Sequence, residues 1–264
     1  MEQSYWLKQE KDKPLFPDLI WSRPENKAHG GKLLIVGGNI HSFNAVNLSY
    51  QESLKAGAGS VKVILPDVLQ KTLSKLFPEA DYAASTPSGG FSLSALAAFI
   101  EMSGWSDEVL LAGDFSKNSE TAILIEKYIA KYGGLLTLAN DAVDIALTNL
   151  EYLTKRENTI FVVSYAQLTK MSATLKYHKA FISSLDLMQI IDLLHDFTKT
   201  KNCTLVVLKD NIIFVAAKGK VSTTIHNYKG HISLTKIASQ VSVWALHNPN
   251  YLFEAATTAA LADN

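Results

Sequence analysis

Short apolar runs alternate with helix-like segments along most of this sequence, and this alternation is the feature that most constrains the fold. The runs that predict strands are rich in Val, Ile and Leu and cover residues 32–36, 60–65, 108–112, 135–138, 159–163, 205–208 and 212–216. The segments with the apolar spacing or end signals of helices are 44–56, 66–77, 93–102, 121–132, 185–198, 234–246 and 250–261. We therefore predict an α/β protein with three layers (α/β/α) and a mainly parallel central sheet.

The length and composition of the chain favour one large domain. It has 264 residues, of which 47% are hydrophobic and 19% are charged, so a sizeable core can form. Residues 1–25 are mostly polar and contain Pro14, Pro17 and Pro24, which is typical of an arm rather than of core. The prediction is an N-terminal arm over 1–25 and a single domain over 26–264.

The charge balance and the single cysteine exclude several classes of protein. Lys+Arg and Asp+Glu both number 25, so there is no overall attraction to nucleic acid or to an anionic membrane. No apolar run approaches the length of about 18 residues that a membrane span needs. Cys203 lies in an apolar run and predicts a buried small side chain, because one cysteine forms no internal disulfide. A cytoplasmic location is the expectation, since the N-terminal residues lack the apolar core of a signal peptide.

In parallel sheets of this kind, ligands bind outside the carboxyl ends of the strands. Gly37-Gly38-Asn39 stands between a predicted strand and a predicted helix, so the backbone there can approach a ligand, and the helix offers free N–H groups to an anion. The segment is neither a G-x-G-x-x-G motif nor a P-loop. Plain turn chemistry remains an alternative explanation.

Residues 26–66 resemble the opening of a known family, the ribokinase-like ATP- or ADP-dependent NAD(P)H-hydrate dehydratases. The residues that fit the family's frame are Lys27, Gly31, Gly37, Gly38, Ala45 and the block Lys55-Ala56-Gly57-Ala58-Gly59. Weaker similarity continues through residues 136–143, 206–216 and 248–261. The resemblance implies a ribokinase-like fold for nearly the whole chain after residue 25.

The resemblance also implies a chemistry and a set of contacts. These enzymes pass a phosphoryl group from ATP or ADP, with Mg²⁺ as a candidate partner, to a hydrated NAD(P)H-type ligand. The implied nucleotide contacts are Gly113, Lys209, Gly230, His231 and Ile232, and the implied substrate contacts are Gly38, Asn39, Ala45 and Asp141. A surface role at a strand end is the alternative for Lys209.

The catalytic motif of that family, G-T-G-D, corresponds here to Gly230-His231-Ile232-Ser233. Its glycine-rich turn aims N–H groups at the phosphoryl group, and its aspartate accepts the hydroxyl proton. The β-branched Ile232 crowds that approach. Ser233 stands at the aspartate position and accepts no proton without a base of its own, so we expect it to cap the following helix.

Other site motifs also differ from the family pattern. The glycine-rich G-P-G-L-G loop becomes residues 113–117 with Asp114, and T-P-H-x-G-E becomes residues 162–167 without its histidine and carboxylate. Asp114, Asp141 and Asp210 all end predicted strands, and nothing in the sequence selects one as a replacement base. No metal site is predicted, because the spacing of His226 and His231 has no cysteine pair to complete it.

Three functions follow from these residues. The first is a diverged relative that binds a nucleotide or dinucleotide with weak or no catalysis. The second is an active NAD(P)H-hydrate dehydratase or small-molecule kinase with a different base. The third is a non-enzymatic assembly or regulatory subunit that docks through residues 250–261, and a homo-oligomer is left open.

Overall fold

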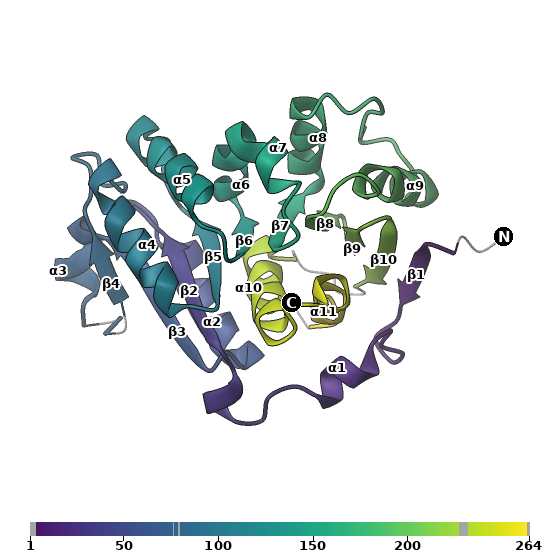
Figure 1. Cartoon of the computed structure of the whole chain (residues 1–264), viewed down its shortest axis with the longest axis horizontal. Helices are drawn as coiled ribbons and strands as arrows, with labels where there is room; N and C mark the ends of the chain where they lie inside the picture. The colour runs from purple at the N-terminus through teal and green to yellow at the C-terminus, as the bar shows by residue number, and fades with distance from the viewer. Residues whose placement is uncertain (1–3, 76, 79, 227–231, 263–264) are drawn as a thin grey trace.

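The computed structural model describes residues 4–75, 77–78, 80–226 and 232–262. Within them a sheet of ten strands has the order β1-β10-β9-β8-β7-β6-β5-β2-β3-β4 (Figure 1). The strands are β1 (Trp6–Gln9), β2 (Lys32–Gly37), β3 (Ser60–Pro66), β4 (Ala80–Ala83), β5 (Glu108–Gly113), β6 (Leu135–Ala139), β7 (Thr159–Ser164), β8 (Thr204–Lys209), β9 (Ile212–Ala217) and β10 (Lys220–Ile225). β9 pairs antiparallel with β8 and β10, and the other pairs are parallel. The prediction of a mainly parallel sheet is confirmed.

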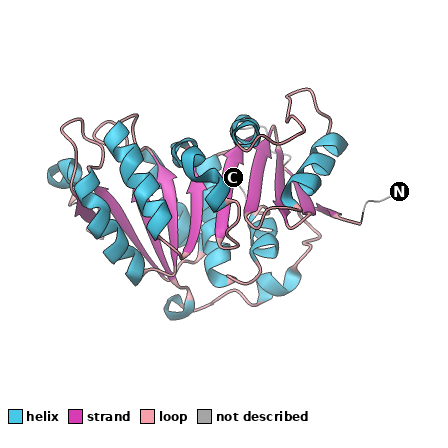
Figure 2. Cartoon of the chain, turned by 45° about the horizontal axis from the view of Figure 1, so that its top comes forward, coloured by secondary structure: helices cyan, strands magenta, loops and turns pink. Residues whose placement is uncertain are grey.

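Helices cover both faces of this sheet (Figure 2). One face carries α2 (Asn44–Ala56), α10 (Leu234–His247) and α11 (Leu252–Ala259), and the other carries α4 (Leu96–Trp105), α5 (Ser119–Lys131), α6 (Asp141–Ile145), α7 (Leu150–Leu153), α8 (Tyr165–Thr174) and α9 (Leu187–Thr198). The short helix α1 (Pro17–Trp21) packs against α11, and α3 (Gln70–Leu73) lies beside β4 at the edge of the sheet (Figure 1). Central strands are apolar on both sides: Leu33 and Ile35 enter one core, and Leu34 and Val36 enter the other. The three-layer prediction is therefore confirmed.

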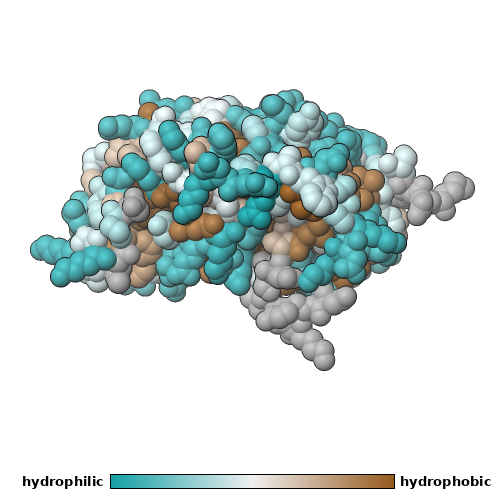
Figure 3. All heavy atoms as spheres, turned by 90° about the horizontal axis from the view of Figure 1, so that it is seen from below, coloured by the Kyte–Doolittle hydropathy of each residue, from teal (hydrophilic) through white to brown (hydrophobic). Residues whose placement is uncertain are grey.

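The last helix, α11, packs its apolar face against the rest of the protein. Phe253, Ala255 and Ala256 of α11 are buried in the core shared with α10. Core packing thus accounts for the apolar character that also suggested a docking helix. On the face drawn in Figure 3, hydrophilic residues dominate and apolar residues form small separate patches. Among the described residues, no helix combines the length and apolar character needed to cross a membrane.

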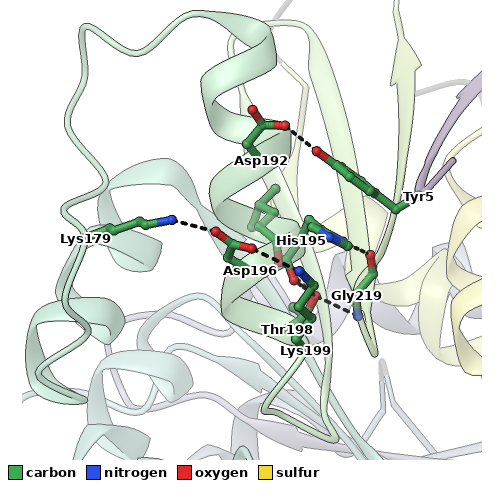
Figure 4. Close-up of polar contacts among 9 residues, drawn as sticks. Tyr5, Lys179, Asp192, His195, Asp196, Thr198, Lys199 and Gly219 are labelled. Atoms are coloured by element: carbon green, nitrogen blue, oxygen red, sulfur yellow. Dashed lines mark hydrogen bonds and ion pairs between the residues drawn. The ribbon is translucent and has the colours of Figure 1, made fainter. Parts of the chain in front are cut away.

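Part of the segment predicted to be an arm belongs to the sheet. Residues 6–9 form β1, which pairs with β10 at the edge. The Tyr5 ring stacks on His195 with ring centroids 3.5 Å apart, and its hydroxyl donates to Asp192 at 2.6 Å (Figure 4). The Nδ1 of His195 donates in turn to the carbonyl of Gly219. Gln9, which is 2% exposed, donates to Thr224 Oγ1 at 3.0 Å and to the carbonyl of Thr257 at 2.6 Å.

Other boundaries also differ from the sequence expectation. The helix predicted over 66–77 is shorter: a 3₁₀ turn and α3 end at Leu73, and Phe77 packs against Phe43 and Tyr50 instead. The strands β4 and β10 and the helix α8 were not predicted. A capping box, in which the Ser164 and Gln167 side chains each bond the other's backbone, starts α8.

Candidate functional site

The topological switch point of the sheet lies between β2 and β5. The chain leaves β2 toward β3 on one side, whereas β5 leads to β6 on the other, so a crevice opens outside their carboxyl ends. Gly38 N–H donates to the carbonyl of Gly113 at 3.0 Å. A Cβ on Gly37 would lie 2.3 Å from the same oxygen, so only glycine permits this approach. The Gly-Gly turn therefore joins the two strands that border the crevice.

Asn39 and Asp114 fix the loops on either side of this crevice. The Asn39 amide donates to the carbonyl of Asp114 at 2.7 Å, and its Oδ1 accepts the N–H of His41 at 2.8 Å. Asp114 has a φ of 60°, a conformation that aspartate tolerates better than most residues. Its Oδ2 accepts the N–H of Ala45 at 2.8 Å. A carboxylate of the chain itself thus occupies the first turn of α2, where a free helix N-terminus would attract an anion.

Asn140 and Asp141 line the same edge after β6. The Asn140 amide donates to the carbonyl of Ala112 at 2.7 Å and to Thr235 Oγ1 at 3.0 Å, which ties β5 to the start of α10. Asp141 Oδ2 accepts the N–H of Phe115 at 2.9 Å, whereas its Oδ1 has no hydrogen-bond partner among the described residues. Burial, followed by the nearby charge of Asp114, raises the pKa of Asp141 above its usual range.

Two adjoining cavities share Asp114 and Asp141. The larger, about 730 Å³, is also lined by Asn39, Ser116, Lys117, Asn118, Ser119, Ala122, Asp144, Ile145 and Lys170. The smaller, about 410 Å³, lies toward the first turns of α2 and α10 and is lined by Asn44, Ala45, Leu48, Asn140 and Thr235 in addition to the shared pair. Together they have the size of a small-molecule site at the switch point.

The larger cavity carries both signs of charge. Lys170 Nζ and Asp144 Oδ1 form an ion pair at 2.8 Å, and Gln167 Nε2 donates to Asp144 Oδ2 at 3.0 Å. Burial acts to raise the pKa of Asp144, but these bonds outweigh it and hold the pKa below its usual value. No ion pair of the described residues includes Lys117.

The start of α10 holds no carboxylate at the position where the resemblance implies one. Ser233 is the N-cap residue, and its Oγ accepts the N–H of Lys236 at 3.4 Å. The expected capping role of Ser233 is confirmed. Ile232 is 3% exposed and packs into the core, and Gly230 and His231 lie outside the described residues.

Lys209 ends β8 at the same edge of the sheet as the crevice, but its side chain is engaged elsewhere. Its Nζ donates to the carbonyl of Leu185 at 3.0 Å and lies 5.0 Å from the ring centroid of Tyr165. It lines neither of the two cavities. The structure thus brings together Gly38, Asn39, Ala45, Gly113 and Asp141 around the crevice and places Lys209 outside its lining.

In the described part of the chain, His226 and Cys203 line neither of the two cavities. No group of three or more His, Cys, Asp and Glu side chains there is arranged to hold a metal ion. The Nε2 of His226 donates to the carbonyl of Ala260 at 2.8 Å. Cys203 is fully buried, and burial raises the pKa of its thiol to about 12, so it is no nucleophile at neutral pH.

Sequence reasoning missed Lys117, Asp144, Lys170 and Thr235 as lining residues. One signal was available: Ser164 and Gln167 have the spacing of a capping box, which predicts a helix that carries Lys170 to the cavity. Nothing comparable marks Thr235, because its place depends on how α10 packs across the sheet.

Comparison with solved structures identifies the fold, although no known protein-family profile matches the sequence. A ribokinase-like superfamily protein from Enterococcus faecalis superposes with a TM-score of 0.72 at 15% identity, covering 97% of this chain and 86% of that protein. A hypothetical protein from Streptococcus mutans gives a TM-score of 0.69 at 16% identity, covering 92% and 84%. The ADP/ATP-dependent NAD(P)H-hydrate dehydratase from Bacillus subtilis, co-crystallized with ATP and Mg²⁺, gives 0.63 at 12%, covering 93% and 85%. The chain therefore has a ribokinase-like α/β/α fold, and the structures that share it include an NAD(P)H-hydrate dehydratase.

Proposed function

We propose that this chain binds a nucleotide- or dinucleotide-type small molecule at the carboxyl edge of its sheet and transfers phosphoryl groups weakly or not at all. The observation that carries the binding is the pair of adjoining cavities at the switch point, which share Asp114 and Asp141. Support also comes from the fold, since the Bacillus subtilis dehydratase was co-crystallized with ATP and Mg²⁺.

The start of α10 is the reason that we expect phosphoryl transfer to be weak or absent. A proton acceptor is needed beside the attacking hydroxyl, and Ser233 uses its oxygen to accept the N–H of Lys236. Ile232 fills the adjacent position with a buried β-branched side chain. In the lining of the smaller cavity, the carboxylate of Asp114 already accepts the N–H of Ala45 and would repel a phosphate.

In this proposal Mg²⁺ would bind together with the phosphates of the ligand, not at a separate protein site. The described residues provide no preformed cluster of three metal-binding side chains. Mg²⁺ is commonly held by one or two carboxylates together with substrate phosphates. Asp114 and Asp141 are the carboxylates that both cavities share, so they would complete such a shell.

Titration calorimetry with ATP, ADP, NAD and NADPH tests the binding. We expect at least one ligand to bind below millimolar concentration and Asp141→Asn to change its affinity. Asp18→Asn, at an exposed position on α1, is the matched control. Absence of binding by all four ligands at millimolar concentration contradicts the proposal.

A second candidate is an active kinase or NAD(P)H-hydrate dehydratase that uses Asp141 as its base. Its support is the raised pKa of Asp141 and the oxygen without a partner, since both favour proton uptake. Recovery of absorbance at 340 nm from hydrated NADH with ATP or ADP tests it, and Asp141→Asn must then abolish turnover. A blank trace for the natural protein excludes the dehydratase activity.

The double substitution Ile232→Gly with Ser233→Asp separates the two candidates. It rebuilds the glycine–aspartate pair that the resemblance implies. If the cavities bind both ligands, the double variant gains phosphoryl transfer that the natural protein lacks. Turnover by the natural protein at the level of the double variant favours the second candidate.

A further inference from the structure

A separate cavity lies at the opposite edge of the sheet from the crevice. The amino end of β8, the turn that joins β9 to β10 and the first turn of α11 line it, and α11 packs across these three strands. Its volume is about 250 Å³, which is below the roughly 300–1,000 Å³ of pockets for drug-sized ligands. A ligand of this cavity is therefore smaller than a nucleotide, and among the described residues the cavity shares no lining with the crevice.

Thr204, the first residue of β8, brings a buried hydroxyl group to this cavity. The residue is 2% exposed and lines the cavity. Its side chain lies on the sheet face that α11 covers, because Leu205 enters the core on the other face and successive side chains of a strand alternate. Within the described part of the chain, the Thr204 hydroxyl has no hydrogen-bond partner. Buried polar groups are normally paired, so this hydroxyl indicates a partner inside the cavity.

The first turn of α11 presents unpaired donors to the same cavity. Tyr251, the N-cap residue, makes no side-chain bond to the helix. The N–H groups of Leu252, Phe253 and Glu254 have no partner among the residues that the structure describes. All three residues line the cavity, and Phe253 is only 6% exposed. Free N–H groups at a helix N-terminus attract an anionic group such as a carboxylate.

The charged side chains around the cavity balance each other. Lys218 Nζ donates to Glu157 Oε1 at 3.1 Å. Lys220 Nζ lies 3.8 Å from Glu254 Oε1, which is too long for a hydrogen bond, so the ammonium group keeps free donors and the carboxylate keeps free acceptors. A purely anionic ligand would meet two carboxylates, and a purely cationic ligand would meet two ammonium groups. A molecule that carries both charges matches this lining.

We infer that this cavity binds a small zwitterion of the α-amino-acid type. The carboxylate of the ligand accepts the free N–H groups of α11 and a bond from Lys220, and its ammonium group donates to Glu254. Both charged groups of an α-amino acid stand on one carbon atom, so they fit a lysine and a glutamate whose charged atoms are 3.8 Å apart. The Thr204 hydroxyl, which both donates and accepts, bonds to either group. The site does not depend on the proposed nucleotide binding, because it lies at the amino ends of the parallel strands.

Calorimetric titration of the full chain with L-leucine and L-glutamine tests the binding. The two amino acids are similar in size and differ in the polarity of the side chain, and we expect at least one of them to bind at millimolar concentration or below. Isocaproate and isoamylamine are leucine without its ammonium group and without its carboxylate, and glutaramate and γ-aminobutyramide are the same analogues of glutamine. Each analogue should bind at least tenfold more weakly than its parent, because it loses one set of charge-assisted hydrogen bonds.

Substitutions in the lining test the place of binding. Thr204→Val keeps the shape and removes the hydroxyl, so the affinity should fall about 2- to 10-fold. Lys220→Met and Glu254→Gln each remove one charge and should weaken binding at least tenfold. The Lys220 side chain is 61% exposed, so Lys220→Met should keep the unfolding midpoint of the natural protein. Thr72→Val and Lys71→Met, at exposed positions on α3, are the matched controls and should bind as the natural protein does.

Three outcomes would overturn the inference. Neither amino acid binds at millimolar concentration, an analogue binds as tightly as its parent, or the affinity is unchanged in all three lining variants, which would put the ligand elsewhere. Nucleotide binding is a separate readout, and Thr204→Val should leave it unchanged, because Thr204 and the crevice lie at opposite edges of the sheet. Failure of the amino acids to bind thus leaves the proposed function standing.

Discussion

At the β1 edge every side chain labelled in Figure 4 has a partner, whereas at the carboxyl ends of β5 and β6 two buried side-chain oxygens have none. These are Oγ of Ser116 and Oδ1 of Asp141. Three non-glycine residues at these strand ends, Asp114, Ser116 and Asn140, also have positive φ. Strain and unpaired polar groups of this kind accumulate where a protein binds ligands, and complete pairing is typical of regions that serve stability.

Among substitutions expected to lower stability, the largest effect is expected at Gln9. Replacing it in Gln9→Ala leaves the carbonyl of Thr257 without its donor, so the free energy of unfolding should fall by about 1–3 kcal/mol. Urea denaturation of Gln9→Ala and of the exposed control Gln51→Ala measures it. Equal urea midpoints for the two variants would show that the contacts of Gln9 do not stabilise the fold.

Glu108 lies at the amino end of β5, the end away from the crevice, and predicts a dependence of stability on pH. It is fully buried, and burial raises its pKa well above the usual value despite the hydrogen bond that Thr137 donates to its Oε1 at 2.7 Å. Because the folded pKa is raised, its contribution to stability is complete below about pH 4.3, the unfolded value, and is lost as pH rises toward the folded pKa. Over that window the folding constant should fall by up to tenfold per pH unit through this group.

The variant Glu108→Gln removes that titration. It should unfold with the same free energy as the natural protein near pH 4 and with a larger one at pH 8, as measured by denaturation at each pH. Curves for the two proteins that run parallel from pH 4 to 8 would rule out a buried neutral Glu108.

A smaller loss is expected from Tyr5→Phe. The ring still stacks on His195, but the bond to Asp192 is gone, so the free energy of unfolding should drop by about 0.5–1.5 kcal/mol. Tyr251→Phe, at a 60% exposed position, is the control for thermal unfolding. If the control loses as much free energy of unfolding as Tyr5→Phe does, the bond from Tyr5 to Asp192 has no specific stabilising effect.

The smallest effect, a gain in stability, is expected at Ser116. Its φ of 69° disfavours a side chain, and its hydroxyl is buried without a partner. Ser116→Gly should therefore raise the free energy of unfolding by up to about 1 kcal/mol. A loss of stability in thermal unfolding would show that the loop is held by contacts that outweigh its strain.

Sequence patterns predicted the central strands because their apolar residues serve both cores, as Leu33 to Val36 do in β2. They failed for β1 and β10, which are held by pairing with β10 and with β1 and β9, respectively, rather than marked by local apolar content. The crevice was predicted in outline, since strand ends are visible as Gly37, Gly113 and Asp141. That Lys209 turns to Leu185 could not be predicted, because the contact joins side chain and backbone across a loop of irregular structure.

The register of β1 with β10, in which Trp6 lies beside Val221, has a consequence for synthesis on the ribosome. Elongation proceeds at about 5–20 residues per second, so β1 waits on the order of 10 to 40 s for its partner. During that interval its N–H and C=O groups face water, and Lys8 and Glu10 beside them discourage pairing with other chains. Among the described strands β1 is synthesised before the other nine but pairs only with β10, so the N-terminal segment joins the sheet late in synthesis.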